Sequence, residues 1–206
     1  MEYTIREIQK QEYPLLDNFL YEAIFIPEGI EPPPKSIISS PELQIYVKHF
    51  GESKDDWGLV AEVGGKIVGA VWVRNMNDYG HIDDETPSLA ISLYKKYRGF
   101  GIGTAMMKEI LTLLKSHGYS RVSLSVQKAN YATKMYLKIG FEIVKENEEE
   151  YIMVYYLSCE LKVCSTMKPD NPTVLLVLPA VPELSALCII RAFGLKGGKN
   201  VSGNNA

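Results

Sequence analysis

The sequence feature that most constrains the fold is a glycine-rich turn between two segments of different hydrophobic pattern. The turn reads Arg98-Gly99-Phe100-Gly101-Ile102-Gly103. It follows residues 89–94, which are mainly apolar, and leads into residues 102–117, where apolar residues recur at helical spacing. A helix N-terminus has unpaired N–H groups and a positive dipole end, and glycines let the backbone approach a phosphate closely. The pattern therefore predicts a pyrophosphate-binding strand–turn–helix unit, to which Arg98 adds a cation.

Two common nucleotide-binding motifs do not fit this turn. A Rossmann fingerprint requires G-x-G-x-x-G, but counting from Gly99 places Thr104 at the last position, and counting from Gly101 places Met106 there. A P-loop requires G-x-x-x-x-G-K-[ST], and the chain contains no Gly-Lys-Ser or Gly-Lys-Thr. Both motifs are therefore excluded.

The other hydrophobic patterns predict a mixed α/β domain. Alternating segments indicate strands, and apolar residues at helical spacing indicate helices. The resulting order, β-α-α-β-β-β-α-β-α-β-β, indicates a mixed sheet with helices on its faces. In chain order, the expected elements are a strand at 3–8, helices at 12–25 and 41–50, strands at 59–63, 66–74 and 89–94, a helix at 102–117, a strand at 121–126, a helix at 130–139, and strands at 141–144 and 151–157.

The glycine-rich turn resembles the (Gln/Arg)-x-x-Gly-x-(Gly/Ala) signature of the GNAT superfamily of acyl-CoA-dependent N-acyltransferases. A second segment resembles that superfamily's other hallmark, because Asn130 is followed by Met135-Tyr136 and then by Gly140-Phe141. The resemblance includes the element order and extends over about residues 3 to 157. It implies a GNAT-like fold with splayed central strands. It also implies an enzyme that moves an acetyl group from acetyl-CoA to a primary amine, by direct attack in a ternary complex.

The resemblance further implies which residues bind acetyl-CoA. Exposed backbone groups of the strand before the turn would bind the pantetheine arm as an added strand. The turn amides would hold the pyrophosphate with Arg98 beside it, and Asn130 would either contact the pantetheine arm or only cap its helix. The implied strand residues are Ile91, Ser92 and Leu93, and the implied turn residues are Gly99, Phe100, Gly101, Ile102, Gly103 and Thr104.

The resemblance assigns the catalytic acid to Tyr136. Its phenol would protonate the departing CoA thiolate, and the alternative is a ring that only packs on the sheet. Some relatives carry a Glu on the strand before the Asn, and the matching residue in this chain is Ser125. The general base therefore stays unassigned. No metal is expected. No Cys lies near the motif, so a covalent acyl-enzyme on a thiol is not expected either. The remaining base candidates, each of which is more often an ordinary solvated charge than a base, are Glu62, His81, Asp83, Asp84 and Glu85.

The acceptor amine is expected to bind at the segments least like the common core of the fold. These segments are residues 25–38, residues 75–85 and the turn of the final hairpin. The sequence leaves open whether the acceptor is a small molecule, a peptide N-terminus or a lysine. Acidic residues that would attract a cationic amine, if they converge, are Glu28, Glu31, Asp83, Asp84 and Glu85.

Two other classes of function remain open at this point. The first is a non-catalytic acyl-CoA-binding sensor or scaffold of the same fold, which would keep the glycine-rich turn and lack the catalytic acid. The presence of Tyr136 favours the enzyme over this alternative. The second is an interaction protein whose working part is the C-terminal segment.

The composition changes sharply near Ser158. All 13 Tyr and both Trp lie before this point, and all three Cys lie after it. We therefore expect one domain over residues 1–158 and an extension of unknown role over residues 159–206, whose end is expected to be disordered. The cysteine spacing matches no zinc pattern. The apolar run at 174–190 is short and interrupted by prolines, so a membrane span is not expected.

The charge balance limits the classes of partner. The chain has 22 Lys and Arg against 25 Asp and Glu, which gives a net charge of −3 and argues against a dedicated nucleic-acid binder. Residues 1–10 are charged and lack the apolar region of a signal peptide, so a cytoplasmic location is expected. The expected partners are acetyl-CoA and an amine. The edge formed by the last two strands also allows a homodimer.

Overall fold

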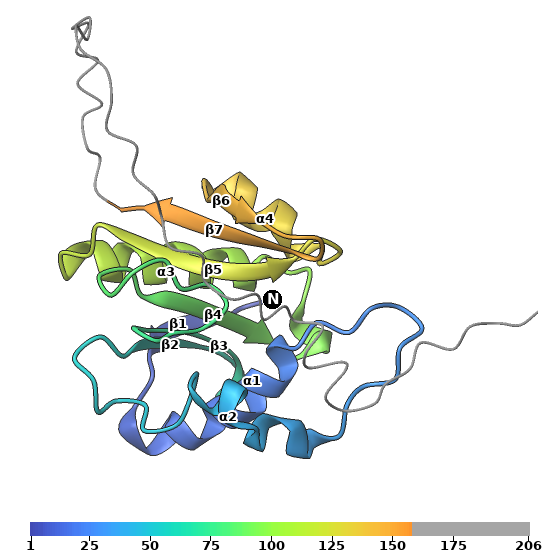
Figure 1. Cartoon of the computed structure of the whole chain (residues 1–206). Helices are drawn as coiled ribbons and strands as arrows, with labels where there is room; N and C mark the ends of the chain where they lie inside the picture. Colours follow the sequence, from blue (N-terminus) through green and yellow to red (C-terminus); the bar gives the residue numbers. More distant parts are fainter. Residues whose placement is uncertain (158–206) are drawn as a thin grey trace, which may run out of the picture. The chain divides into compact units, whose positions relative to one another are not determined.

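A computed structural model describes residues 1–157, whose seven strands form one mixed sheet (Figure 1). The strands lie in the order β1-β2-β3-β4-β5-β7-β6, and all neighbours are antiparallel except β4 and β5. The expected extension over residues 159–206, with its disordered end and apolar run, lies outside the described residues. The strands are β1 (Thr4–Glu7), β2 (Trp57–Val63), β3 (Lys66–Arg74), β4 (Ser88–Leu93), β5 (Arg121–Gln127), β6 (Glu142–Glu146) and β7 (Glu150–Tyr156).

Helices cover both faces of the sheet. Alternate side chains of β4 reach opposite layers, because the Ser92 hydroxyl donates to the Phe19 carbonyl at 2.6 Å, whereas Leu93 packs with Ile102 in the core. Helix α1 therefore lies on one face and α3 on the other (Figure 1). The α-helices are α1 (Leu16–Ala23), α2 (Pro41–Gln44), α3 (Ile102–Ser116) and α4 (Ala132–Ile139), and the 3-10 helices are η1 (Lys10–Leu15), η2 (Lys35–Ser39) and η3 (Lys95–Tyr97).

The main core lies between the sheet and α3. Met106, Ile110 and Leu114 recur at helical spacing and are fully buried against the strands. Burial of each such side chain stabilises the fold by about 1.5–3 kcal/mol. On the opposite face, the fully buried Trp72 donates its indole N–H to the Tyr46 carbonyl at 3.0 Å. The sheet is therefore anchored on both faces.

The predicted mixed α/β fold is confirmed, whereas two predicted helices are shorter than expected. The hairpin turn at Gly64 and Gly65 has φ of +57° and +74°, values that glycine adopts readily. The helix expected over 12–25 divides into η1 and α1, because Pro14 lies inside the first turns and lacks an N–H donor. The helix expected over 41–50 ends at Gln44.

Arg74 at the end of β3 explains the early end of α2. Its Nη1 donates to the carbonyls of Ile45 and Lys48, both at 2.9 Å. Its Nε and Nη2 bind the Asp56 carboxylate at 3.0 and 3.2 Å. Arg74 is 9% exposed and the Asp56 side chain is completely buried. The segment after α2 is therefore organised around a buried ion pair rather than by helical hydrogen bonds.

Replacing Arg74 is expected to be costly. Arg74→Met leaves the buried Asp56 carboxylate without a cation and should lower the free energy of unfolding by about 3–5 kcal/mol. Arg6→Met is the matched control, because Arg6 also binds two carboxylates, Glu12 and Glu62, but its side chain is 30% exposed. The control should lose about 1 kcal/mol or less. Urea unfolding monitored by circular dichroism measures both losses, and equal losses would contradict this account.

Candidate active site

The two central strands separate after a single pair. β4 and β5 are paired only at Ser88 and Ser123, where the Ser123 N–H donates to the Pro87 carbonyl at 3.0 Å. At the other end of β4, the Tyr94 N–H donates to a carbonyl of β3 at 3.0 Å. Because successive backbone groups point to opposite edges of a strand, odd-numbered residues face β5 and even-numbered residues face β3. The N–H and C=O of Ile91 therefore face the gap between the splayed strands.

The glycine-rich turn leaves the N-terminus of α3 uncapped. The first helical hydrogen bond runs from the Ala105 N–H to the Gly101 carbonyl, and within residues 1–157 the amides of residues 99–104 have no backbone acceptor. No side chain caps the helix, and its first turn carries no acidic residue. Gly99 and Gly101 have φ of +84° and +81°, and a Cβ on either would meet no atom within 4 Å. Uncapped donors beside open space are suited to binding an anion.

Two predicted acetyl-CoA ligands fix neighbouring segments in the structure. Arg98 donates from Nε to the Leu93 carbonyl at 2.9 Å, and from Nη2 to the carbonyl and carboxylate of Glu22 at 3.2 and 3.3 Å. The Ser92 hydroxyl is bonded to the Phe19 carbonyl, and its backbone pairs with β3. Arg98 and Ser92 thus hold α1 against the end of β4 and the turn.

The end of β5 and the start of α4 together contain one capping group and two unsatisfied polar atoms. The Asn130 Oδ1 accepts the Ala132 N–H at 3.0 Å, which is the capping alternative for this residue. Gln127 Oε1 and Thr133 Oγ1 are buried and have no hydrogen-bond partner in the described part of the chain. Such atoms are costly unless a ligand or water satisfies them. This end of β5 therefore offers polar groups to a ligand.

Tyr136 is a buried phenol on α4. A Cβ on Gly103 would lie 3.9 Å from the Met135 sulfur, so α4 packs against the first turn of α3. The Tyr136 ring contacts Phe141 with 5.8 Å between centroids, and no described residue forms a hydrogen bond to its hydroxyl. Burial raises the pKa of Tyr136 above its ordinary value, so the phenol is protonated at neutral pH. It is an available proton donor.

Asp83 and Asp84, two of the acidic residues expected to attract the acceptor, differ in their surroundings. Asp83 accepts a hydrogen bond from Thr86 at 2.7 Å and pairs with Arg121 at 2.5 Å, and these contacts lower its pKa. The Asp84 side chain is fully exposed. Glu62, a candidate base, is paired with Arg6 at 2.5 Å. Asp83 is thus occupied by Arg121, and the hypothesis that residues 83–85 attract a cationic amine stays a prediction.

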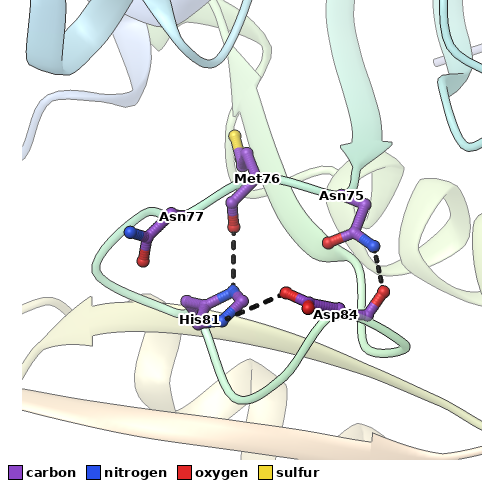
Figure 2. Close-up of a pocket in the computed structure, with 5 residues that line it drawn as sticks. All are labelled: Asn75, Met76, Asn77, His81 and Asp84. Carbon is purple, nitrogen blue, oxygen red and sulfur yellow. Dashed lines mark hydrogen bonds and ion pairs between the residues drawn. The ribbon is translucent and has the colours of Figure 1, made fainter.

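The loop between β3 and β4 covers β5. A Cβ on Gly80 would lie 3.1 Å from the backbone carbon of Leu124 and the backbone nitrogen of Ser125. Figure 2 shows His81 in this loop, with Nδ1 bonded to the Met76 carbonyl at 3.1 Å and Nε2 4.0 Å from the Asp84 carboxylate. The loop forms an open pocket of about 440 Å³, lined by Asn75, Met76, Asn77, His81 and Asp84.

A second groove adjoins this pocket and shares Asn75 and Met76 with it. It has a volume of about 820 Å³, and its other lining residues come from α1, η2, α2, the segment after α2 and the end of β3. The loop that packs over β5 contributes to both hollows. Residues of the segment 75–85 thus line open hollows, and its expected role in binding the acceptor stays a prediction.

Two carboxylates were missed by sequence reasoning, half-buried Asp78 within this loop and buried Glu150 on β7. Asp78 accepts hydrogen bonds from the hydroxyls of Ser88 and Tyr46 at 2.6 and 2.9 Å. Glu150 is 7% exposed and accepts one from the Ser125 hydroxyl at 3.3 Å. Burial raises the pKa of both carboxyl groups. The only signal for Glu150 was its place in the alternation of β7, and this signal is hidden by the run of glutamates before it.

Comparison with known proteins identifies the family. The sequence model described as "Acetyltransferase (GNAT) family" matches residues 7–141, which include β4, the glycine-rich turn and α4. The chain belongs to the GNAT acetyltransferase family. The resemblance stated from the two motifs is thereby confirmed, as is the expectation of an acyltransferase family.

Two relatives of this GNAT protein carry acetyltransferase names. "Probable N-acetyltransferase camello" from Xenopus tropicalis is 34% identical over 98 residues, which is 46% of this chain and 42% of the relative. "N-alpha-acetyltransferase" from Sulfurisphaera tokodaii is 28% identical over 123 residues, which is 52% of this chain and 73% of the relative. The match thus spans less than half the length of the first relative.

Solved structures show the same fold. The PaiA N-acetyltransferase from Thermoplasma acidophilum, in complex with coenzyme A, has a TM-score of 0.57 and 20% identity, covering 76% of this chain and 99% of that chain. The ribosomal-protein-S18-alanine N-acetyltransferase from Escherichia coli has a TM-score of 0.54 and 16% identity, covering 84% of this chain and 100% of that chain. At these identities the similarity shows the fold alone.

Two further features concern membranes and metals. Within residues 1–157, no helix is long and apolar enough to cross a membrane. The same part of the chain contains no group of three or more His, Cys, Asp or Glu side chains that are arranged to hold a metal ion.

The close packing of Gly80 on β5 leads to a testable prediction. Gly80→Ala places a methyl group against rigid backbone, so the loop must move or the strand must shift. We expect a loss of about 1–3 kcal/mol in stability and faster limited proteolysis of the loop. Asn77→Ala, which changes an exposed side chain of the same loop, should leave both unchanged. Identical behaviour of the two variants would show that the loop does not pack on β5.

Proposed function

We propose that this protein is an N-acetyltransferase that moves an acetyl group from acetyl-CoA to a primary amine, by direct attack in a ternary complex. One observation carries the proposal: the uncapped N-terminus of α3 lies at the end of the gap between β4 and β5. A pyrophosphate bound at the turn would place a linear arm along the free edge of β4. Family membership supports the same reaction.

The residues proposed to bind acetyl-CoA form a narrower set than the sequence implied. The amides of residues 99–104 would hold the pyrophosphate, and the backbone of Ile91 and the N–H of Leu93 would pair with the pantetheine arm. The unsatisfied Gln127 Oε1 and Thr133 Oγ1 fit the polar groups of such an arm. Arg98 and Ser92 would act by holding the turn and β4 in place.

The proposed role of Tyr136 is to protonate the CoA thiolate as it leaves. A protonated phenol with no hydrogen-bond partner among residues 1–157 suits this role, and α4, which carries it, packs against the first turn of α3. A direct transfer needs no covalent intermediate on the protein. The alternative of a non-catalytic acyl-CoA sensor would leave this buried phenol without a function.

The acceptor is proposed to approach from the face that carries α1, α2 and the β3–β4 loop. The names of two similar proteins specify N-alpha or alanine acetylation, so a peptide with a free N-terminal amine is the first acceptor to test.

We also propose that the domain ends near Ser158, because β7 ends at Tyr156 and the next N–H, of Leu157, still bonds to the Ser120 carbonyl at 2.7 Å. All residues of β6 are exposed, which fits the proposed homodimer edge.

Calorimetry of acetyl-CoA binding tests the phosphate site. Gly101→Glu puts bulk and negative charge into the turn, and we expect wild-type binding in the micromolar range to weaken at least tenfold, which is about 1.4 kcal/mol. Gly118→Glu is the matched control at the other end of α3, because Gly118 has the same positive φ and equally open surroundings. The control should bind like the wild type. Absence of binding by the wild type would overturn the proposed function.

Replacing Tyr136 tests the catalytic acid. Tyr136→Phe keeps the ring contact with Phe141 and removes only the hydroxyl, so kcat should fall by about 10²–10⁴-fold while the KM for acetyl-CoA changes little. Tyr155→Phe is the control, because its ring packs on the same Phe141. Thiol release is measured with a chromogenic reagent. An unchanged kcat in Tyr136→Phe would limit this residue to packing.

A further inference from the structure

We propose that Glu150 is the general base that takes a proton from the acceptor amine. This inference rests on the proposed function and adds the group that the sequence left unassigned. Glu150 is the first residue of β7 and pairs with Gln127, the last residue of β5. Glu150 therefore lies on β7, which does not border the gap between β4 and β5. Its side chain nevertheless reaches β5, which does.

The position of the carboxylate follows from the strand register. Ser125 and Gln127 on β5 share a face with Ser123, whose hydroxyl lies 3.4 Å from that of Ser88 on the α1 side of the sheet. Glu150 lies on this same face because it pairs with Gln127. Its Oε2 accepts the hydrogen bond from Ser125, so the carboxylate leans over β5, which borders the gap.

The position of Glu150 along the direction of the strands also matches that of Ile91 on β4. β4 and β5 run parallel with Ser88 opposite Ser123, so Ser125 lies level with Ala90 and Gln127 lies level with Ser92. Ile91, whose backbone faces the gap, lies between these two levels. A thioester attached to an arm paired with Ile91 would therefore lie beside the Glu150 carboxylate. An amine that approaches from the α1 side of the sheet would meet this carboxylate.

The bonding of Glu150 is incomplete for a buried carboxylate. Asp78, on the same side, is satisfied by two hydroxyl donors at 2.6 and 2.9 Å, whereas Glu150 has a single donor at 3.3 Å within residues 1–157. No cation pairs with Glu150 in the described residues, and nearby Lys128 is bound to Glu146 at 2.8 Å. Burial of a carboxylate without strong partners is costly, so this arrangement is expected where a substrate supplies the missing donor.

The surroundings of Glu150 raise the pKa of its carboxyl group. Burial and the neighbouring Glu149 raise its pKa, and the Ser125 hydrogen bond lowers it less. Tyr46, from the segment after α2, is the other titratable group that interacts with Glu150, and the Tyr46 hydroxyl is bonded to Asp78. A raised carboxyl pKa brings the base closer to the pKa of the amine.

The proton transfers balance over the whole reaction. Glu150 takes one proton from the ammonium form of the acceptor, and the freed lone pair of the nitrogen forms the C–N bond to the thioester carbon. The C–S bond then breaks and the sulfur leaves with the bonding electrons. Tyr136 gives its proton to the sulfur and regains one from the nitrogen of the adduct. The products are the amide, the CoA thiol and one proton, which Glu150 returns to solvent.

His81 is the competing base. It lines the pocket of Figure 2, but its Nδ1 is bonded to the Met76 carbonyl and its Nε2 faces the exposed carboxylate of Asp84. It lies in the loop above β5 rather than on a strand beside the gap. His81→Gln is therefore included as a separate variant in the test.

The test compares pH profiles of acetyl transfer by the full-length chain. The probes are an alanine tripeptide with a free N-terminus and spermidine, and the faster of the two is used. Glu150→Gln should lower kcat/KM about 100-fold at pH 6.5, with unchanged acetyl-CoA affinity by calorimetry. Its kcat/KM should then rise about tenfold per pH unit toward the pKa of the amine, because only neutral amine reacts. Wild type should show a plateau, so the difference shrinks at high pH.

Controls separate the proposal from its alternatives. Glu148→Gln changes an exposed carboxylate of the same turn and should keep the wild-type profile. Glu150→Asp retains the carboxylate and should keep the plateau at a reduced rate. A wild-type profile in Glu150→Gln, or a loss of the plateau only in His81→Gln, would overturn the assignment of Glu150. A wild type that binds acetyl-CoA and acetylates neither probe would overturn the proposed function, and this assignment with it.

Discussion

The uncapped N-terminus of α3 is the constraint on which the rest of the site depends. The first amides of a helix have no intrahelical acceptor, and no described side chain caps those of α3. Gly99 and Gly101, both of positive φ, leave open space beside these donors. Arg98 and Ser92 then hold α1, β4 and the turn together, so the donors keep their direction without a ligand. The site is thus organised by residues that need not touch the substrate.

A gap inside a sheet leaves backbone groups unpaired, and it persists only where the strands on each side are held by other contacts. β4 is paired with β3 along its length, and β5 is paired with β7 in the same way. The β3–β4 loop adds a further restraint, since Gly80 packs directly on the backbone of β5. Asp78 belongs to this loop and accepts a hydrogen bond from Ser88, on the face of the sheet that also carries Glu150. The loop that restrains β5 therefore lies on the same face as the proposed base.

Local sequence patterns predicted the features that depend on local chemistry. The Gly64-Gly65 hairpin, α3 and the uncapped turn follow from glycine positions and helical spacing, and the structure has all of them. The bonding of Arg98 to Glu22 was not predictable, because it joins residues 76 positions apart. The burial of Glu150 was also not predictable, because it depends on contacts between segments distant in the sequence. Its burial depends on the pairing of β7 with β5, whereas in the sequence it resembles the solvated glutamates beside it.

Amide hydrogen exchange of the full-length chain, with and without acetyl-CoA, tests the central claim most directly. The account predicts slower exchange at two places upon binding: the amides of residues 99–104 and the amide of Ile91. Exchange in β6 and at the C-terminal end of α3 should not change. Unchanged exchange at the turn under saturating acetyl-CoA, or protection confined to other segments, would contradict the claim that the turn and the gap bind acetyl-CoA together.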